Sequence, residues 1–405
     1  MQDSGAFDLL SSSFLANPYP TYARLRSEAP VYFSQEWKSW LITRYDDVVA
    51  CYREPRLSAD RAKAFSDLLP PELRPVAEPI VRNMSSWALQ MDPPTHTRLR
   101  ALLNQAFTPR LMQELQPRIG EIAAELIEQL ASQPEVDLVK ALAEPLPIAV
   151  IGELLGLAPS EWPLLKSWST ALVTFLGTPR VTVEILQQAA HAISSMEDFF
   201  RVELQKRRAA PRQDLLSNLL QASERGTILG EQELLSTCCM VLFGGHETTT
   251  NLIGNAIRHL YAQPVEVRQS LQESAKMSVA VEEIMRFESP VQRMGRLVTE
   301  DFALHGQTLC KGQRVFLMLG SANRDSAHFA DADQLVLDRR ENRHLGFGFG
   351  SHYCVGAALG RMETALCLSR LFARIPSLKL IEKEPQWVPN ATVRGPASLL
   401  ATTHV

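Results

Sequence analysis

The chain has 405 residues, 45% apolar and 21% charged, an ordinary globular composition that excludes a disordered or fibrous protein. Its 41 basic and 45 acidic side chains leave a net charge of −4, which excludes a protein that binds nucleic acid through bulk positive charge. No C-x-x-C pair occurs among the cysteines, which argues against a disulfide framework or a tetrahedral zinc cluster and favours a reducing cytosol; they are Cys51, Cys238, Cys239, Cys310, Cys354 and Cys367.

The N-terminal residues give no sign of export or membrane insertion. Asp3 and Asp8 stand where a signal peptide would have a basic segment and an apolar segment. One of the more apolar runs, 234–245, is shorter than the ~20 residues that a spanning helix needs. We therefore expect a cytoplasmic protein without a membrane anchor.

The predicted elements are mostly helices. Before residue 95, short strand-like pieces at 30–33 and 40–43 alternate with helical segments, and after it helical periodicity dominates. One buried helix face is marked by Ile119, Ile122, Leu126, Ile127 and Leu130. Strand patterns return only in short pieces, for example at 313–317 and 378–381, and no alternating βαβ units occur. We predict a mainly α fold with small peripheral β-sheets, organised as one domain over residues 1–405.

Residues 231–263 read as one long helix that Pro264 ends, yet Gly244 and Gly245 lie near its middle. Each glycine costs a helix about 1 kcal/mol relative to alanine, and the polar and β-branched residues 246–250 add to that cost. Such a break indicates either a flat ligand lying against the backbone, with hydroxyls bending the helix, or a close contact between crossing helices. A zinc protease motif H-E-x-x-H is excluded, because Thr250 stands where the second histidine is required.

The second unusual segment is a glycine-rich loop, residues 346–356, that leads into a predicted helix. Backbone N–H groups and the helix dipole there would stabilise a Cys354 thiolate and lower its pKa. A phosphate-binding loop fits less well, because the glycine spacing is G-x-G-x-G and no clear strand precedes it. A cysteine nucleophile paired with His352 is also disfavoured, because residues so close in a loop seldom have the required geometry. A single thiolate among glycines favours an axial ligand to one metal.

The pattern F-x-x-G-x-x-x-C-x-G, formed by Phe347, Gly350, Cys354 and Gly356, resembles the haem-binding loop of the cytochrome P450 superfamily. Residues 244–248 (GGHET) resemble that family's oxygen-activating helix kink, 283–286 (EIMR) its E-x-x-R pair, and 91–100 (MDPPTHTRLR) the helix that holds the haem propionates in soluble bacterial members. The resemblance implies the cytochrome P450 fold, a helix-rich triangular prism that encloses haem b, iron protoporphyrin IX.

The resemblance also implies residue roles. It makes Cys354 the iron ligand, Glu247 and Thr248 the acid–alcohol pair that delivers protons, and Glu283, Arg286 and Arg339 a buried network that supports the cysteine loop. It assigns the remaining cofactor contacts to His96, Arg100, Arg296 and His352 at the propionates, to Phe347, Gly350 and Gly356 in the loop, and to Gly244 and Gly245 at the kink.

Family geometry directs the substrate to residues 65–89 and 164–176, and to a mostly apolar set comprising Leu89, Met240, Phe243, Val291, Met294 and Val393. We therefore expect a hydrophobic small molecule that is hydroxylated or epoxidised with one oxygen atom of O2, in secondary metabolism such as polyketide, macrolide or terpenoid tailoring. No flavin or iron–sulfur segment follows the cysteine loop, so we expect electrons to come from NAD(P)H through a separate ferredoxin or flavodoxin with its reductase. We also expect a monomer. Such carriers are acidic, and their docking would use rim charges at Arg98, Arg110, Arg343 and Arg361.

Two other functions stay open at this point. One is a peroxide-driven haem-thiolate peroxygenase, which Glu247 and Thr248 argue against because those relatives lack the acid–alcohol pair. The other is a catalytically silent haem-binding partner protein, which missing proton-delivery residues would favour.

Overall fold

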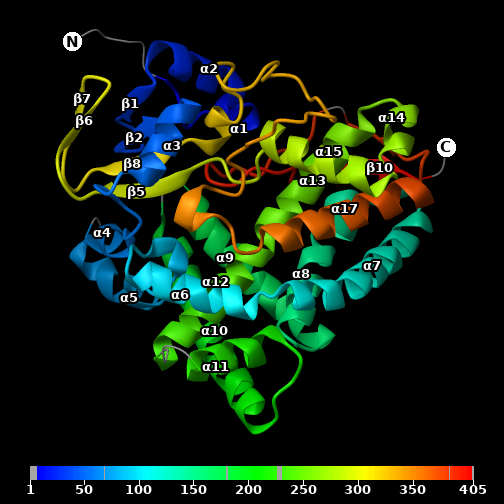
Figure 1. Ribbon diagram of the computed structural model, residues 1–405, viewed down its shortest axis with the longest axis horizontal. Coiled ribbons are helices and arrows are strands. Elements are labelled where there is room, and N and C mark those ends of the chain that lie inside the picture. The colour runs from blue at the N-terminus through cyan, green and yellow to red at the C-terminus, as the bar shows by residue number, and fades with distance from the viewer. Residues whose placement is uncertain (1–6, 68, 179–180, 226–229, 383, 404–405) are drawn as a thin grey trace.

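A computed structural model describes residues 7–67, 69–178, 181–225, 230–382 and 384–403. Helices make up most of the molecule, and the largest sheet lies on the opposite side from strand β10 (Figure 1). The α-helices are α1 (Ser12–Ala16), α2 (Tyr19–Glu28), α3 (Tyr45–Arg53), α4 (Ala62–Asp67), α5 (Arg74–Met84), α6 (Thr95–Ala106), α7 (Pro109–Ala131), α8 (Pro145–Leu154), α9 (Trp162–Gly177), α10 (Val183–Ala209), α11 (Leu215–Arg225), α12 (Glu231–Gly245), α13 (Glu247–Tyr261), α14 (Val265–Ser270), α15 (Ser274–Phe287), α16 (Leu319–Ala322) and α17 (Ala357–Arg374).

The strands form three small sheets. Their bounds are β1 (Val31–Ser34), β2 (Ser39–Ile42), β3 (Leu57–Ser58), β4 (Glu135–Asp137), β5 (Met294–Val298), β6 (Phe302–Leu304), β7 (Gln307–Leu309), β8 (Arg314–Leu317), β9 (Lys379–Leu380) and β10 (Leu400–Thr402). The largest sheet has the order β1-β2-β8-β5-β3, in which β2 and β8 are parallel and the other pairs antiparallel. The architecture confirms the mainly α fold with small peripheral sheets, and the four predicted strand segments fall on β1, β2, β8 and β9.

The long helix α7 buries the predicted apolar face against α17. Ile119, Ile122, Ile127 and Leu130 are buried at helical spacing, while Leu126 at the edge of that face is half-buried. The helices α13 and α17 run through the middle of the molecule, and the largest sheet lies to one side (Figure 1). None of the helices in the described ranges is long and apolar enough to cross a membrane.

The prediction of one helix over residues 231–263 was wrong. The structure has two helices, α12 and α13, and His246 separates them with φ −98° and ψ −79°. The cause is local, because two adjacent glycines and the following polar, β-branched residues weaken the helix at that point. The chain nevertheless continues directly from one helix into the next, because His246 is the single residue between them.

Candidate active site

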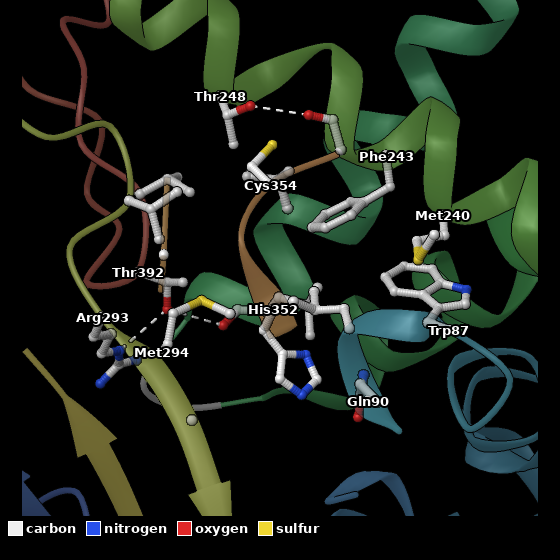
Figure 2. Close-up of a pocket in the computed structure, with 18 of the residues that line it drawn as sticks. Trp87, Gln90, Met240, Phe243, Thr248, Arg293, Met294, His352, Cys354 and Thr392 are labelled. Carbon is white, nitrogen blue, oxygen red and sulfur yellow. Dashed lines mark hydrogen bonds between the residues drawn. The ribbon is translucent and has the colours of Figure 1, made fainter. Parts of the chain in front are cut away.

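A cavity of about 680 Å³ lies between the α12–α13 break and the loop that carries Cys354. Cys354 lies inside the protein. Its accessible surface therefore faces the cavity and not the outer surface of the molecule. Figure 2 shows the sulfur pointing toward the side of the cavity where Thr248 lies. The glycine pair between α12 and α13 and the glycine-rich cysteine loop, the two unusual segments of the sequence, therefore face each other across this cavity.

Glycines shape the cysteine loop. Gly348 and Gly350 have φ values of +76° and +65°, a conformation that residues with a Cβ seldom adopt. A Cβ at Gly348 would also stand 3.1 Å from the His352 carbonyl oxygen. The Cys354 N–H donates to the Phe347 carbonyl at 2.8 Å and closes the loop just before α17.

The predicted lowering of the Cys354 pKa was wrong for the protein alone. Burial raises the pKa of the thiol, and the Gly356 N–H, Arg100 and Arg361 offset only part of that rise. The helix dipole and glycine N–H groups are thus outweighed by the loss of water around the sulfur. A bound metal cation is the stronger stabiliser of a thiolate, because its full charge acts directly on the sulfur.

Glu283 and Arg286 are fully buried on α15 and bind each other through two hydrogen bonds of 2.7 and 2.8 Å. Arg339 donates to Glu283 Oε2 at 3.0 Å, so the three residues form one network. Arg286 also donates to the carbonyl oxygens of Asn323, Ala332 and Gln334. Asn323 Oδ1 in turn accepts from the Leu345 N–H at 2.7 Å, which links the network to the start of the cysteine loop.

The four residues predicted at the propionates come together near one end of the cavity. The rings of His96 and His352 lie 4.2 Å apart, and Arg100 donates to the Tyr353 carbonyl at 2.5 Å. Arg296 is buried and donates only to the Gly295 carbonyl among the described residues. His96 Nδ1 is buried without a hydrogen-bond partner there. These donors fit the carboxylates of a haem.

Sequence reasoning missed two members of this group. Arg61 lies against Gly295 and lines the cavity, and its guanidinium donates only to backbone carbonyls among the described residues. Burial and the charge of Arg296 lower the Arg61 pKa to about 10, so it stays cationic at neutral pH. The Tyr52 hydroxyl is buried without a hydrogen-bond partner among the described residues. The centre of its ring lies 5.0 Å from the Arg296 guanidinium. Neither residue belongs to a recognisable sequence motif, and only the tertiary structure brings them here.

The two histidines act here as neutral donors. Burial, then the charge of Arg296 and the neighbouring His96 ring, lower the His352 pKa to about 3. Burial followed by Arg100 likewise lowers the His96 pKa. Positive charge in this part of the wall therefore comes from the arginines Arg61, Arg100 and Arg296, while the histidines supply N–H groups.

The glycines at the helix break have different surroundings. A Cβ on Gly245 would stand 2.7 Å from Ile151 Cδ1 of α8, so this glycine permits a close helix contact. A Cβ on Gly244 would meet nothing within 4 Å, although both glycines line the cavity. The close contact between crossing helices is thus observed at Gly245, whereas the uncovered backbone at Gly244 leaves room for a ligand.

Thr248 lines the cavity, and its hydroxyl donates to the Gly244 carbonyl at 2.9 Å across the break (Figure 2). The Glu247 side chain is not part of the cavity lining and instead accepts from the Thr170 hydroxyl at 2.9 Å. Burial raises the Glu247 pKa, despite the Thr170 hydrogen bond, so the carboxyl can hold a proton more readily than a solvated glutamate. The break also leaves backbone carbonyls available to hydroxyl groups.

All six residues predicted to contact substrate line the cavity. Trp87 packs 5.1 Å from Phe243, and further apolar lining comes from α5 and α9 within the two predicted segments. Figure 2 shows Trp87 and Met240 on one side of Cys354, and Met294, Thr392 and Arg293 on the other. Arg293 and Arg314 also line the cavity, although no sequence motif singles them out.

The four rim arginines differ in how free they are. Arg110 pairs with Glu114 at 2.8 Å, Arg361 pairs with Glu282, and Arg98 pairs closely with Glu233. Arg343 is exposed and has no ion pair within the described part of the chain. These contacts leave Arg343 as the rim arginine most available to an acidic partner.

Comparison with known proteins identifies the family. Residues 148–392 match the family model described as Cytochrome P450. The chain is 35% identical to the polyketide biosynthesis cytochrome P450 PksS of Bacillus subtilis, over 95% of this chain and 96% of that protein. Among solved structures, P450BioI in complex with hexadec-9Z-enoic acid ligated acyl carrier protein superposes with a TM-score of 0.88 at 31% identity, covering 97% of this chain and 99% of that one. Myxobacterial CYP267B1 in complex with myristic acid gives 0.87 at 36% identity, with 98% and 99% covered. The expected fold is therefore confirmed, and the chain belongs to the cytochrome P450 family of haem-thiolate monooxygenases.

Proposed function

We propose that this cytochrome P450 would hold haem b through the Cys354 thiolate and would insert one oxygen atom of O2 into a hydrophobic small molecule held in the cavity. One observation carries the proposal: the Cys354 sulfur faces the same cavity as Thr248 and an apolar wall. When bound, the haem supplies the oxygen-binding iron and its redox chemistry.

The chain's own residues would hold this group at three places. Cys354 would ligate the iron, with the Gly356 N–H donating to its sulfur. The propionates would be bound by the three arginines Arg61, Arg100 and Arg296 and by the two histidines His96 and His352. Gly244 leaves room for a flat ring against α12, because no side chain covers the backbone there.

Thr248 and Glu247 would control protons. The Thr248 hydroxyl faces the cavity and could hold water beside it, while Glu247 stands one residue away and outside the lining. The raised Glu247 pKa brings that carboxyl closer to neutral pH, where a proton donor and acceptor works best. Thr170 orients the carboxyl through its hydroxyl.

The cavity lining favours a hydrophobic substrate, and the relatives favour a place in secondary metabolism. Most of the surface is apolar, with the aromatic rings of Trp87 and Phe243 on one side. The name of PksS places that relative in polyketide biosynthesis, and the P450BioI structure contains an acyl carrier protein with a fatty acid. These two relatives support a substrate drawn from polyketide or acyl chemistry.

Electrons would come from NAD(P)H through a separate ferredoxin or flavodoxin and its reductase. Arg343 is exposed and, unlike the other three rim arginines, has no ion pair among the described residues, so it is the rim cation most available to an acidic carrier. Replacing it should slow reduction of the protein and leave substrate binding unchanged.

The test is a reduced carbon monoxide spectrum of the purified protein reconstituted with haem, followed by turnover under ¹⁸O2. We expect a thiolate-type absorption shift and one labelled oxygen atom per product molecule, dependent on NADPH and a redox partner. Cys354→Ser should lose the thiolate-type shift, whereas Cys239→Ser, a buried cysteine outside the cavity lining, should keep it.

Two results would overturn the proposal. A wild-type protein without the thiolate-type shift would remove Cys354 from the iron. Product formed with peroxide, but not with O2 and a redox partner, would instead favour a peroxygenase.

A further inference from the structure

Arg293 is a buried cation in the wall of the cavity, immediately before β5. Its side chain is only 7% exposed, and its guanidinium lies 4.1 Å from the ring centres of both Trp37 and Phe316. Its Nε donates to the Thr392 hydroxyl at 3.2 Å, the interaction drawn in Figure 2. Among the described residues, its two terminal nitrogens have no hydrogen-bond acceptor.

A second arginine, Arg314 at the start of β8, lines the same end of the cavity. It donates to the Trp37 carbonyl at 2.7 Å, and burial lowers its pKa. The two guanidinium groups are close enough to repel each other, since Arg314 lowers the Arg293 pKa. Lys38, in the turn between β1 and β2, adds a third positive charge to this end of the lining.

No carboxylate within the described ranges forms an ion pair with either arginine. Glu36 lines the same end, but its carboxylate accepts from the Leu9 N–H at 3.0 Å. Elsewhere the fold pairs its most buried arginines with acids, as Arg207 with Glu203 and Asp214 shows.

Arg293 nevertheless keeps its charge at neutral pH. Burial lowers its pKa to about 10, with Tyr22 and Arg314 as smaller influences, and that value is well above 7. A buried charge without a counterion is unfavourable, and rings of Trp37 and Phe316 stabilise it only in part. The guanidinium therefore offers two free donors and an uncompensated charge to whatever enters this end of the cavity.

We propose that this end of the cavity binds the carboxylate of an elongated hydrophobic acid, with Arg293 as its direct partner and Arg314 reinforcing the positive potential. The apolar chain of the acid then lies along the lining toward Cys354. A guanidinium fork matches the two oxygens of a carboxylate, and the surrounding apolar wall strengthens the interaction by excluding water. This inference rests on the proposed function, because it names the substrate class of the same cavity.

The test compares tetradecanoic acid with its methyl ester by calorimetric titration of the haem-loaded protein. The two ligands share the chain and differ in charge, so the ratio of their dissociation constants isolates the carboxylate. We expect wild type to prefer the acid by at least about tenfold, as one charge-assisted hydrogen bond allows. Arg293→Met should bring the ratio close to one and leave the ester's affinity nearly unchanged, and Arg293→Lys should keep part of the preference.

Arg208→Met serves as the matched control, since Arg208 is exposed at the end of α10 and its loss changes net charge by the same amount. This variant should keep the wild-type ratio. Equal binding of acid and ester by wild type would overturn the inference, as would an equal loss of both ligands in Arg293→Met. A protein that shows the thiolate-type spectrum and oxidises neutral compounds without any acid preference would leave the proposed function intact and remove this inference alone.

Discussion

Two regions of this molecule treat buried charge in opposite ways. Behind the cysteine loop, Glu283 and Arg286 are both fully buried, and each finds partners for its polar atoms. Around the cavity, Arg293 and Arg296 are almost as buried, yet no carboxylate within the described residues forms an ion pair with them. The first region holds the loop in place, and the second keeps donors available for anionic groups. The difference teaches that burial of a charge alone does not reveal its role, whereas its pairing does.

The sharpest way to break this comparison is to make the same substitution in both regions. Arg286→Met removes two hydrogen bonds from the buried Glu283 carboxylate and the guanidinium donor from three backbone carbonyls, so we expect a loss of about 3–5 kcal/mol in the free energy of unfolding. Arg293→Met strands no acid and should change stability by about 1 kcal/mol or less. Urea unfolding of the haem-free proteins measures both. Equal losses in the two variants would contradict the distinction.

The two glycines at the helix break allow the same comparison on a smaller scale. Gly245→Ala drives a methyl group into Ile151, and overpacking of this kind costs about 1–3 kcal/mol. Gly244→Ala meets no atom within 4 Å, so its stability should be equal to or above that of wild type. Its methyl group enters the cavity, however, and should weaken haem or substrate binding. Thermal unfolding with haem titration distinguishes the two, and similar behaviour of both variants would argue against separate roles.

Thr248→Ala removes a cavity-facing hydroxyl and the bond to the Gly244 carbonyl. We expect oxygen use to become uncoupled, with product formed per O2 consumed falling on the order of tenfold and hydrogen peroxide rising, because proton transfer loses its positioned partner. Oxygen electrode and peroxide assays measure this ratio. Thr174→Ala, a helix threonine with a similar hydroxyl-to-carbonyl bond on α9, is the control and should stay coupled. Fully coupled turnover in Thr248→Ala would count against the proposed role.

The smallest expected effect is a pH dependence at Glu247. Burial raises its pKa in the folded protein, so ionising this carboxyl costs stability once the pH rises above the unfolded value of 4.5. Glu247→Gln removes that cost, and its unfolding free energy should exceed that of wild type at pH 7 and converge with it below pH 4.5. Unfolding curves across this range provide the measurement. A variant less stable than wild type at pH 7 would show that hydrogen bonding by Glu247 outweighs its burial.

Much of the fold and site followed from sequence. The helix periodicity, the short strands and the four motifs led to the architecture and to residues that the structure brings around one cavity. The single long helix failed because its interruption depends on how much the local glycine and hydroxyl preferences weaken it, which periodicity does not measure. The prediction of a lowered Cys354 pKa failed because burial, which depends on the tertiary structure, raises the pKa by more than the local N–H groups lower it.

Sequence by itself determined the family, the glycine cradle of Cys354 and the position at which the long helix is weakened, because each depends on residue types at short, fixed spacing. Only the tertiary structure decided which charges lack a partner. Arg61, Arg293 and Arg314 come from separate segments and form no ion pair among the described residues, whereas the fold brings the distant Glu288 to Arg394 at 2.6 Å. Long-range pairing of this kind depends on which distant segments pack together, and local spacing carries no record of that.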